Sequence, residues 1–364
     1  METLDILVFG AGAIGTYIGG SLAQAGNRVV FIEQPNAVEE LRQRGLRLDL
    51  TVDRGRSPQG TRWTTDDPSS AVYRPSSVEF SSTLEEALKH GPFDVAIFAL
   101  KSFDTASALD GMKPFVGKLP PVLCLQNGVD NELNLAAVLG ADRVIAGTVT
   151  SSVGRGGVGD ILLERQRGVG LVSTHPLSDR LSAALNEAGL NARTFARAAD
   201  MKWSKMLTNL PANATAAILD LTAAEVFAHP GMFRLEMEML REALRVMRAH
   251  GIKVVDLPGV PVRALAFGTK LPGFIGRPLM KKAVGGGRGG KRPSFHIDLH
   301  SGRGKSEVEW LNGAVVRYGK ERGVPTPVNQ VLTEILMALT RGEIPLGEFS
   351  RQPEKLLEKV RSEK

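Results

Sequence analysis

Cysteine is nearly missing from this chain, since Cys124 is the single one among 364 residues. A disulfide bond within the chain is therefore excluded, and a reducing compartment is the expected environment. Long hydrophobic runs are missing as well, because none approaches the roughly 20 residues of a membrane-spanning helix. The acidic start, Met1–Asp5, lacks the basic and apolar regions of a secretory signal. We therefore expect a cytoplasmic protein with no membrane partner.

Aromatic residues are scarce, at 5% of the chain, and positive charge is only in small excess, with 45 Lys and Arg against 39 Asp and Glu. A net charge of +6 suits anionic ligands such as dinucleotides and keto acids. The most basic segment, residues 276–292, has no aromatic side chain among its Gly, Arg and Lys residues. We therefore do not expect nucleic acid as a partner.

His296, Asp298 and His300 alternate shortly after that basic segment. A closed metal site would need further His or Cys ligands, and no such cluster lies nearby in the sequence. A structural or solvated loop is the favoured interpretation, and no metal is expected.

Short apolar runs alternate with helical patterns over about the first 150 residues, a typical domain length. The runs at 6–9, 29–32, 94–100, 122–125 and 144–146 are typical of buried parallel strands. Asn36 is expected to cap a helix that ends near Arg44, and the polar stretch 52–77 is expected to be a loop. The alternation predicts a Rossmann-like, doubly wound parallel sheet, and residues 149–175 predict antiparallel strands after it.

The second half of the chain has a helical pattern. Helices are predicted over 200–218, 223–251, 306–322 and 326–341, with a Gly-, Pro- and Arg-rich segment at 258–305 and a charged, frayed C-terminus. We therefore expect a dinucleotide-binding Rossmann domain over residues 1–190. An all-helical C-terminal domain, carrying substrate and catalytic residues, is expected over 191–364.

A glycine-rich loop follows the first apolar run. Gly10 would permit the tight turn, Gly12 would let the backbone approach a pyrophosphate, and Gly15 would let helix and strand pack closely. The helix N-terminus then offers free N–H groups to the phosphates. A plain strand-to-helix turn is the less favoured alternative in this context. The expected cofactor-binding residues of the loop are Gly10, Ala11, Gly12, Ala13, Ile14 and Gly15.

Glu33 ends the second apolar run, 21 residues beyond Gly12. An acidic residue at this position usually accepts hydrogen bonds from the ribose 2′-hydroxyl, which favours NAD and repels a 2′-phosphate. A solvated carboxylate at the end of a strand is the alternative. Arg42, Arg44 and Arg47 follow closely and could reach a 2′-phosphate, so NADP stays open.

Lys205 and Asn209 are four residues apart and share a helix face. Asn213 is four residues further on, although Pro211 is expected to kink the helix between them. An ammonium with two amides suits the reduction of a ketone, because it stabilises the developing oxyanion and donates the proton. Taken alone, Lys205 would more often be a solvated helix lysine.

The sequence resembles the ketopantoate reductase family (2-dehydropantoate 2-reductases) over most of its length. Five segments in the right order carry the resemblance: the glycine loop, Leu100–Lys101, Gln126–Val129, Trp203–Asn213, and a final block containing Pro293–Ser294, Asp298 and Ser306–Gly313.

The resemblance implies NAD(P)H-dependent reduction of 2-dehydropantoate to (R)-pantoate, within pantothenate and coenzyme A biosynthesis. Lys205 would be the general acid, and Glu307 would orient it or balance its charge and contact the substrate hydroxyl. A capping box of Ser306 with Glu309 would place Glu307 in a first helical turn. The implied ligand-binding residues are Asn209, Asn213, Ser294 and Asn127 for substrate, and Lys101 and Asn127 for the cofactor.

The resemblance implies NADP, whereas Glu33 favours NAD, so the cofactor stays open between the two. Three other functions remain as alternatives: reduction of another 2-oxo acid, reduction of an imine as in opine-type dehydrogenases, and a non-catalytic NAD(P)-binding sensor. A small 2-keto acid is the expected partner, and a homodimer is left open.

Overall fold

The computed structural model describes residues 3–51, 78–280 and 292–363, which form two compact units. The first unit comprises the described residues up to Lys202 together with Leu257–Val260, and the remaining described residues form the second. The change falls inside α7 (Ala198–Asn209), whereas the sequence pattern places it at residue 190. The start of α7 stays with the first unit because Lys202 donates hydrogen bonds to main-chain carbonyls there.

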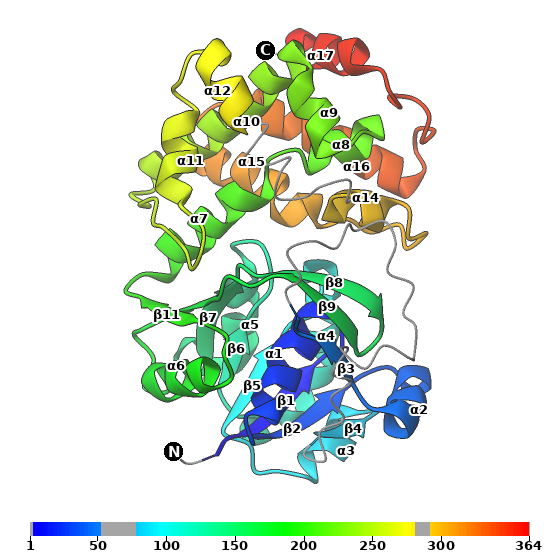
Figure 1. Ribbon diagram of the computed structural model, residues 1–364, viewed down its shortest axis with the longest axis vertical. Helices are drawn as coiled ribbons and strands as arrows, with labels where there is room; N and C mark the ends of the chain where they lie inside the picture. Colours follow the sequence, from blue (N-terminus) through cyan, green and yellow to red (C-terminus); the bar gives the residue numbers. More distant parts are fainter. Residues whose placement is uncertain (1–2, 52–77, 281–291, 364) are drawn as a thin grey trace. The chain divides into compact units, whose positions relative to one another are not determined.

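The first unit is built on an eight-stranded sheet (Figure 1). Its strand order is β11-β10-β7-β6-β5-β1-β2-β4. The strands from β4 to β7 in this order run parallel, whereas β10 is antiparallel to β7. This arrangement confirms the doubly wound sheet. The bounds are β1 (Asp5–Phe9), β2 (Arg28–Ile32), β4 (Val78–Ser81), β5 (Val95–Phe98), β6 (Val122–Cys124), β7 (Val144–Val149), β10 (Val169–Val172) and β11 (Ala192–Phe195).

A second, three-stranded sheet has the order β3-β9-β8 and packs on helix α1 (Ala13–Gln24). Its strands are β3 (Arg47–Asp49), β8 (Ser152–Gly157) and β9 (Asp160–Arg165), and β8 and β9 are antiparallel as predicted. A Cβ added at Gly20 of α1 would lie 2.6 Å from Leu48 Cδ2, so the contact is close. Helix α1 therefore packs against the second sheet as well as against β1, β2 and β5 of the main sheet.

The other helices of the first unit connect its strands, and α2 leads from β2 to β3 of the second sheet. They are α2 (Pro35–Arg44), α3 (Leu84–Leu88), α4 (Thr105–Met112), α5 (Asn131–Leu139) and α6 (Ser178–Glu187), with 3-10 turns η1 (Ser102–Asp104), η2 (Lys113–Lys118) and η3 (Ala141–Arg143). The predicted cap at Asn36 is wrong, because Gln34 is the N-cap and Pro35 occupies the first helical position. Proline is favoured there since its missing N–H would have no helical partner.

The second unit is helical, which confirms the predicted all-helical part. It contains the end of α7 and helices α8 (Ala214–Leu219), α9 (Ala223–Ala228), α10 (Pro230–Ala249), α11 (Val262–Gly268), α12 (Gly273–Met280), α14 (Ser294–Leu299), α15 (Asn312–Glu321), α16 (Pro327–Arg341) and α17 (Pro353–Ser362), with the 3-10 turn η5 (Glu307–Trp310). The long helix α10 packs against α9, α15, α16 and α17. None of the described helices is long and apolar enough to span a membrane.

Three helix predictions need correction, and one of them is 306–322, which divides into η5 and α15 at Leu311. The predicted helix 200–218 is interrupted after Asn209, where Ala212 has φ +50°, and the predicted helix 223–251 breaks at His229–Pro230. The charged C-terminal segment, which was expected to fray, forms α17 with Leu356 fully buried. The predicted loop 52–77 and the centre of 258–305 lie outside the described residues.

Candidate active site

The glycine loop, residues 10–15, joins β1 to α1, and we call it the cradle. Gly10 has φ +93°, and its N–H donates to the Ile32 carbonyl at 3.0 Å. A Cβ at Gly15 would lie 2.0 Å from the Gly10 carbonyl oxygen, so close packing of the helix requires glycine there. A Cβ at Gly12 would meet nothing within 4 Å. Gly12 therefore leaves open space in front of the helix N-terminus.

The side chain of Glu33, which follows β2, contacts this loop. Its Oε2 accepts a hydrogen bond from the Ala11 N–H at 2.7 Å, and its Oε1 accepts one from the Gln34 N–H at 2.9 Å. The Ala11 carbonyl is held as well, by the Thr16 hydroxyl at 2.9 Å and by the Gly159 N–H at 2.8 Å. A carboxylate thus sits at the carboxyl end of β2, beside the cradle.

A pocket of about 410 Å³ opens beside Gly10 and Glu33 at the carboxyl ends of β1 and β2. In doubly wound sheets this edge is where nucleotides bind. Its walls are largely apolar, and its ionisable lining residues are the carboxylates Glu33 and Glu85. Among the described residues that line it there is no lysine or arginine.

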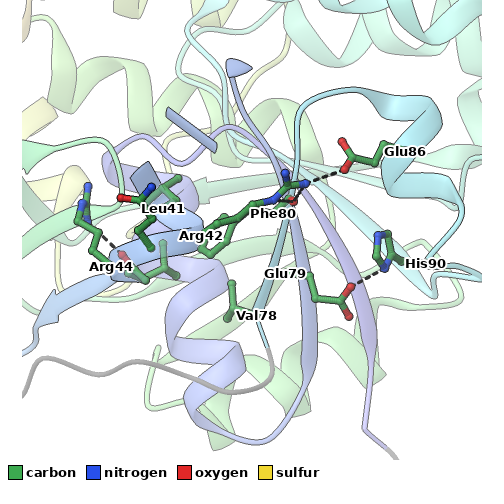
Figure 2. A pocket seen from close by; sticks show the side chains of 11 residues that line it. Leu41, Arg42, Arg44, Val78, Glu79, Phe80, Glu86 and His90 are labelled. Atoms are coloured by element: carbon green, nitrogen blue, oxygen red, sulfur yellow. Dashed lines mark hydrogen bonds and ion pairs between the residues drawn. The ribbon is translucent and has the colours of Figure 1, made fainter. Parts of the chain in front are cut away.

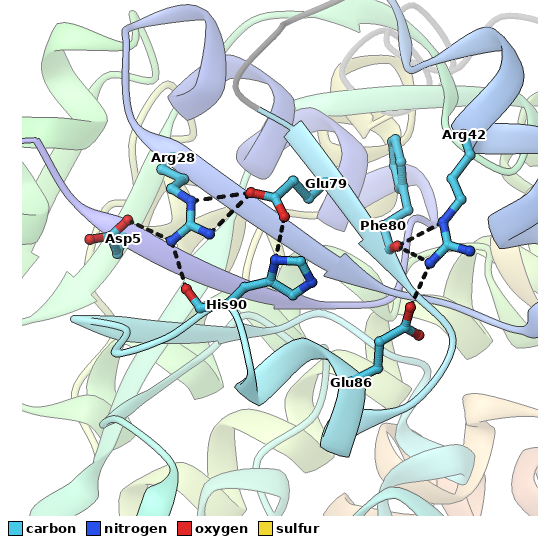
Figure 3. Close-up of polar contacts among 7 residues, drawn as sticks. All are labelled: Asp5, Arg28, Arg42, Glu79, Phe80, Glu86 and His90. Atoms are coloured by element: carbon cyan, nitrogen blue, oxygen red, sulfur yellow. Dashed lines mark hydrogen bonds and ion pairs between the residues drawn. The ribbon is translucent and has the colours of Figure 1, made fainter.

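The arginines that follow Glu33 are engaged elsewhere. Arg42 donates to the Phe80 carbonyl at 2.9 Å and pairs with Glu86 at 2.6 Å (Figure 3). Arg44 pairs with Asp160 at 2.8 Å and also donates to its neighbouring main-chain carbonyl at 3.0 Å. Arg47 Nη1 lies 3.9 Å from the same Asp160. The guanidinium groups of Arg42 and Arg44 hold α2 against β4 and β9, so these contacts do not favour binding of a 2′-phosphate.

A different pocket, of about 560 Å³, lies beside the edge strand β4 and the end of α2 (Figure 2). Its charged lining is already paired, with His90 contacting Glu79 and Arg42 contacting Glu86. Arg28 adds a second contact to Glu79 at 3.0 Å (Figure 3). These ion pairs are partly exposed and fasten the sheet edge, so we assign no ligand to this pocket.

Two loops at the carboxyl ends of β5 and β6 are joined by the side chain of Gln126. Its Nε2 donates to the Leu100 carbonyl at 3.0 Å and to the Thr105 hydroxyl at 2.9 Å. Lys101 follows Leu100 directly, and Asn127 follows Gln126. The main chain next to both implied cofactor residues, Lys101 and Asn127, is therefore held by one network of hydrogen bonds.

The main chain of Asn127 is anchored in the same way. Its carbonyl oxygen accepts hydrogen bonds from the Asn131 amide at 2.6 Å and from the Ser102 hydroxyl at 3.0 Å. Asn131 Nδ2 also lies 3.1 Å from Ser102 Oγ, which closes the network. Asn131 and Ser102 are buried and belong to the first turns of α5 and η1.

In the second unit, Asn213 and Ser294 meet although 81 residues separate them. Asn213 is the N-cap of α8 and is 4% exposed, and its Nδ2 lies 3.2 Å from Ser294 Oγ. Its Oδ1 accepts a hydrogen bond from the Phe295 N–H at 3.1 Å. The structure therefore brings two of the implied substrate-binding residues together at the start of α14.

Two family models cover most of the sequence. The model described as ketopantoate reductase PanE/ApbA matches residues 6–171, and the one described as its C-terminal part matches residues 197–340. The chain belongs to the ketopantoate reductase family. The predicted resemblance is confirmed, and the protein is an oxidoreductase of this family.

Individual relatives with similar sequences carry the name of the same enzyme family. The 2-dehydropantoate 2-reductase of Halobacterium salinarum is 27% identical over 93% of this chain and 99% of its own. That of Streptococcus pyogenes serotype M1 is 24% identical over 92% and 97%.

Solved structures share the fold. A ketopantoate reductase from Ralstonia eutropha has a TM-score of 0.72 at 27% identity, covering 93% of this chain and 99% of its own. D-mandelate dehydrogenase, solved with NADH and anilino(oxo)acetate, has a TM-score of 0.71 at 21% identity and covers 93% and 98%. At that identity the second likeness shows the fold alone.

Lys205 and Asn209 lie half-buried on α7, one turn apart, as the spacing predicts. Asn213 does not continue their helical stripe, because the chain leaves the helix before it. Glu236 of α10, fully buried, supports this break by accepting the Ala212 N–H at 2.8 Å and the Thr215 hydroxyl at 2.6 Å. The kink expected from Pro211 is thus a complete interruption, stabilised by a side chain that carries no local sequence signal.

Glu307 is the first residue of η5 and is 2% exposed. Ser306 does cap this turn, but its hydroxyl accepts from the Val308 N–H at 3.3 Å, one position earlier than in a capping box. The carboxylate of Glu309 lies 3.4 Å from Arg341. The predicted capping box with Glu309 is therefore wrong, because the turn is a short 3-10 helix.

One of the alternating histidines, His296, contacts an aspartate from a distant part of the sequence. His296 Nε2 lies 2.8 Å from Asp220 Oδ1, and the His296 and His300 rings stack at 4.1 Å. Burial lowers the pKa of His296, more than its hydrogen bond with Asp220 raises it. Within the described part of the chain, no three His, Cys, Asp or Glu residues are grouped to hold a metal ion.

Proposed function

We propose that this protein reduces a small 2-oxo acid with NADH, and that 2-dehydropantoate, which would give (R)-pantoate, is the best candidate substrate. One observation carries the proposal: Asn213 and Ser294 form a preassembled polar pair in a chain that matches both ketopantoate reductase models. The names of the curated relatives support the same substrate.

The residues have complementary tasks in the proposed reaction. A reduced nicotinamide held by the Gly10–Gly15 loop would supply the hydride for the carbonyl carbon of the substrate. Lys205 stabilises the negative charge that develops on the carbonyl oxygen and donates the proton that makes it a hydroxyl. Glu307 orients or charge-balances Lys205, and Lys205 is left neutral until it takes a proton from solvent.

Substrate and cofactor are bound by the remaining residues of the proposal. Polar side chains that are already hydrogen-bonded hold a ligand with little loss of entropy on binding. We assign the substrate oxygens to Asn209, Asn213, Ser294 and Asn127, and the cofactor to the loop Gly10–Gly15, Glu33, Lys101 and Asn127.

The loop and its surroundings fit NAD better than NADP. Gly12 leaves the open space that a pyrophosphate would fill, and Glu33 beside it would accept hydrogen bonds from a ribose 2′-hydroxyl. A 2′-phosphate there would meet the carboxylate of Glu33 without a compensating arginine, because Arg42 and Arg44 are paired with Glu86 and Asp160. We therefore propose NADH as the working cofactor.

A two-by-two assay tests the function. NADH and NADPH oxidation would be followed with 2-dehydropantoate and with a panel of other 2-oxo acids and imine-forming mixtures. We expect the highest kcat/KM for NADH with 2-dehydropantoate. A better 2-oxo acid or an imine would overturn the substrate assignment and keep the reductase. Tight NADH binding without turnover on any substrate would favour a sensor and contradict the proposal.

Substitution of Gly12 is expected to weaken NADH binding, whereas substitution of Gly15 is expected to lower stability. Gly12→Ala should change the free energy of unfolding by no more than about 1 kcal/mol, because its Cβ meets nothing. It should nevertheless raise the Kd for NADH about tenfold or more, since the methyl group occupies the space of the pyrophosphate.

Gly15→Ala should instead unfold at lower temperature, because its Cβ overlaps the Gly10 carbonyl. Calorimetry with and without NADH checks both, and equal NADH affinity in Gly12→Ala and wild type would contradict the cradle.

A further inference from the structure

A buried lysine in the first turns of α7 has no part in the reaction proposed above. Lys202 is 4% exposed, and its ammonium lies 2.7 Å from Glu132 Oε1. It also donates hydrogen bonds to two main-chain carbonyls, that of Gln126 at 2.6 Å and that of Gly147 at 3.2 Å. Two of the three N–H donors of the ammonium are therefore used by main-chain carbonyls, while the Glu132 carboxylate balances its charge.

Charge neutralisation alone does not explain this arrangement. A buried ion pair is usually no more stabilising than apolar side chains of similar volume, because both charges lose their hydration. What an apolar pair could not do is bind the carbonyls of Gln126 and Gly147. These carbonyls lie on neighbouring segments, one just after β6 and one within β7.

The Gln126 carbonyl is part of the peptide group that leads into Asn127. The side chain of Gln126 is already bound to Leu100, and the carbonyl of Asn127 is bound to Asn131. Lys202 therefore supplies the contact that holds this loop from the side of β7. All the groups involved belong to the first unit.

We propose that Lys202 is a positioning residue for the reductase, which sets the Gln126–Asn127 loop through its carbonyl contacts, with Glu132 as its charge partner. The inference rests on the proposed function, in which Asn127 meets the nicotinamide ribose and the substrate. Lys202 itself touches neither ligand in this proposal.

The charge of Lys202 is stable. Burial by itself lowers its pKa, but the Glu132 carboxylate raises it, and the net pKa lies above the ordinary lysine value. Lys202 therefore stays protonated through neutral and moderately alkaline pH, and the carbonyl contacts persist with it. Replacing Lys202 should therefore lower kcat without introducing a new pKa into the pH profile of kcat.

Two variants separate positioning from stability. Lys202→Met leaves the Glu132 carboxylate, whose side chain is 15% exposed, without its charge partner and is expected to lower the melting temperature. The double variant Lys202→Met/Glu132→Leu removes both charges and should recover most of the melting temperature. It still lacks the two carbonyl contacts, so we expect faster amide exchange over residues 126–131. We also expect kcat to fall about 10- to 100-fold, the scale of a small misplacement of reacting groups.

The control is Lys118→Met, at an exposed lysine of the same unit, which should match wild type in every measurement. A double variant with wild-type kcat and wild-type exchange would overturn the inference and leave Lys202 as a counter-ion of Glu132. If wild type turns over no 2-oxo acid, the proposed function fails separately. Amide exchange then decides the inference, because unchanged exchange over residues 126–131 overturns it.

Discussion

Lys205→Ala is expected to lower kcat with NADH and 2-dehydropantoate by about 10²- to 10⁴-fold, the usual contribution of a positioned proton donor. The Kd for NADH should stay within a factor of two or so of wild type, because the loop, Glu33 and the pocket beside them all belong to the first unit. Steady-state kinetics together with NADH fluorescence titration measure the two effects independently.

Two further variants make this expectation sharper. Lys205→Arg keeps a positive charge but not a group that readily gives up its proton, so its kcat should also be low. Lys320→Ala, at an exposed lysine of α15, should behave as wild type. Normal turnover in Lys205→Ala would show that the proton comes from another group.

Glu33→Ser is expected to reverse the cofactor preference. The carboxylate would accept charge-assisted hydrogen bonds from the ribose, and one such bond contributes about 1.5–3 kcal/mol. We therefore expect kcat/KM for NADH to fall about 10- to 100-fold. The value for NADPH should rise at the same time, because a carboxylate no longer faces the 2′-phosphate.

Glu85→Gln is the matched control, because Glu85 is a second carboxylate that lines the same pocket, from the first turn of α3 and not from β2. It should leave the ratio of NADH to NADPH activity nearly unchanged. A wild-type enzyme that prefers NADPH, or a Glu33→Ser variant with the wild-type ratio, would contradict the proposed role of Glu33.

Local patterns predicted much of the first unit because short-range physics decides them. The glycine loop could be placed correctly since Gly10 needs a positive φ and Gly15 has no room for a Cβ. The parallel strands could be placed because they are buried on both faces and appear as apolar runs. Where the local pattern was misread, as at Asn36, a neighbouring proline had the stronger claim to start the helix.

The partners of polar side chains could not be predicted in this way. Arg42 had the charge to bind a 2′-phosphate, but folding gives it the Phe80 carbonyl and Glu86 instead. Lys202 and Glu236 lie in helical patterns where a charged residue is normally solvated. Both are buried, however, and both form hydrogen bonds with main-chain groups of other segments. Such burial depends on segments far away in the sequence.

By itself, then, the sequence determined the doubly wound sheet, the glycine cradle, the helical second unit and the family, because periodicity, turn chemistry and ordered motifs are local properties. Only the tertiary structure decided that Asn213 meets Ser294, that Glu33 lies on the loop, and that the nearby arginines are engaged. The physical reason is that each of these contacts joins residues from separate elements, and its geometry exists only once the chain has packed.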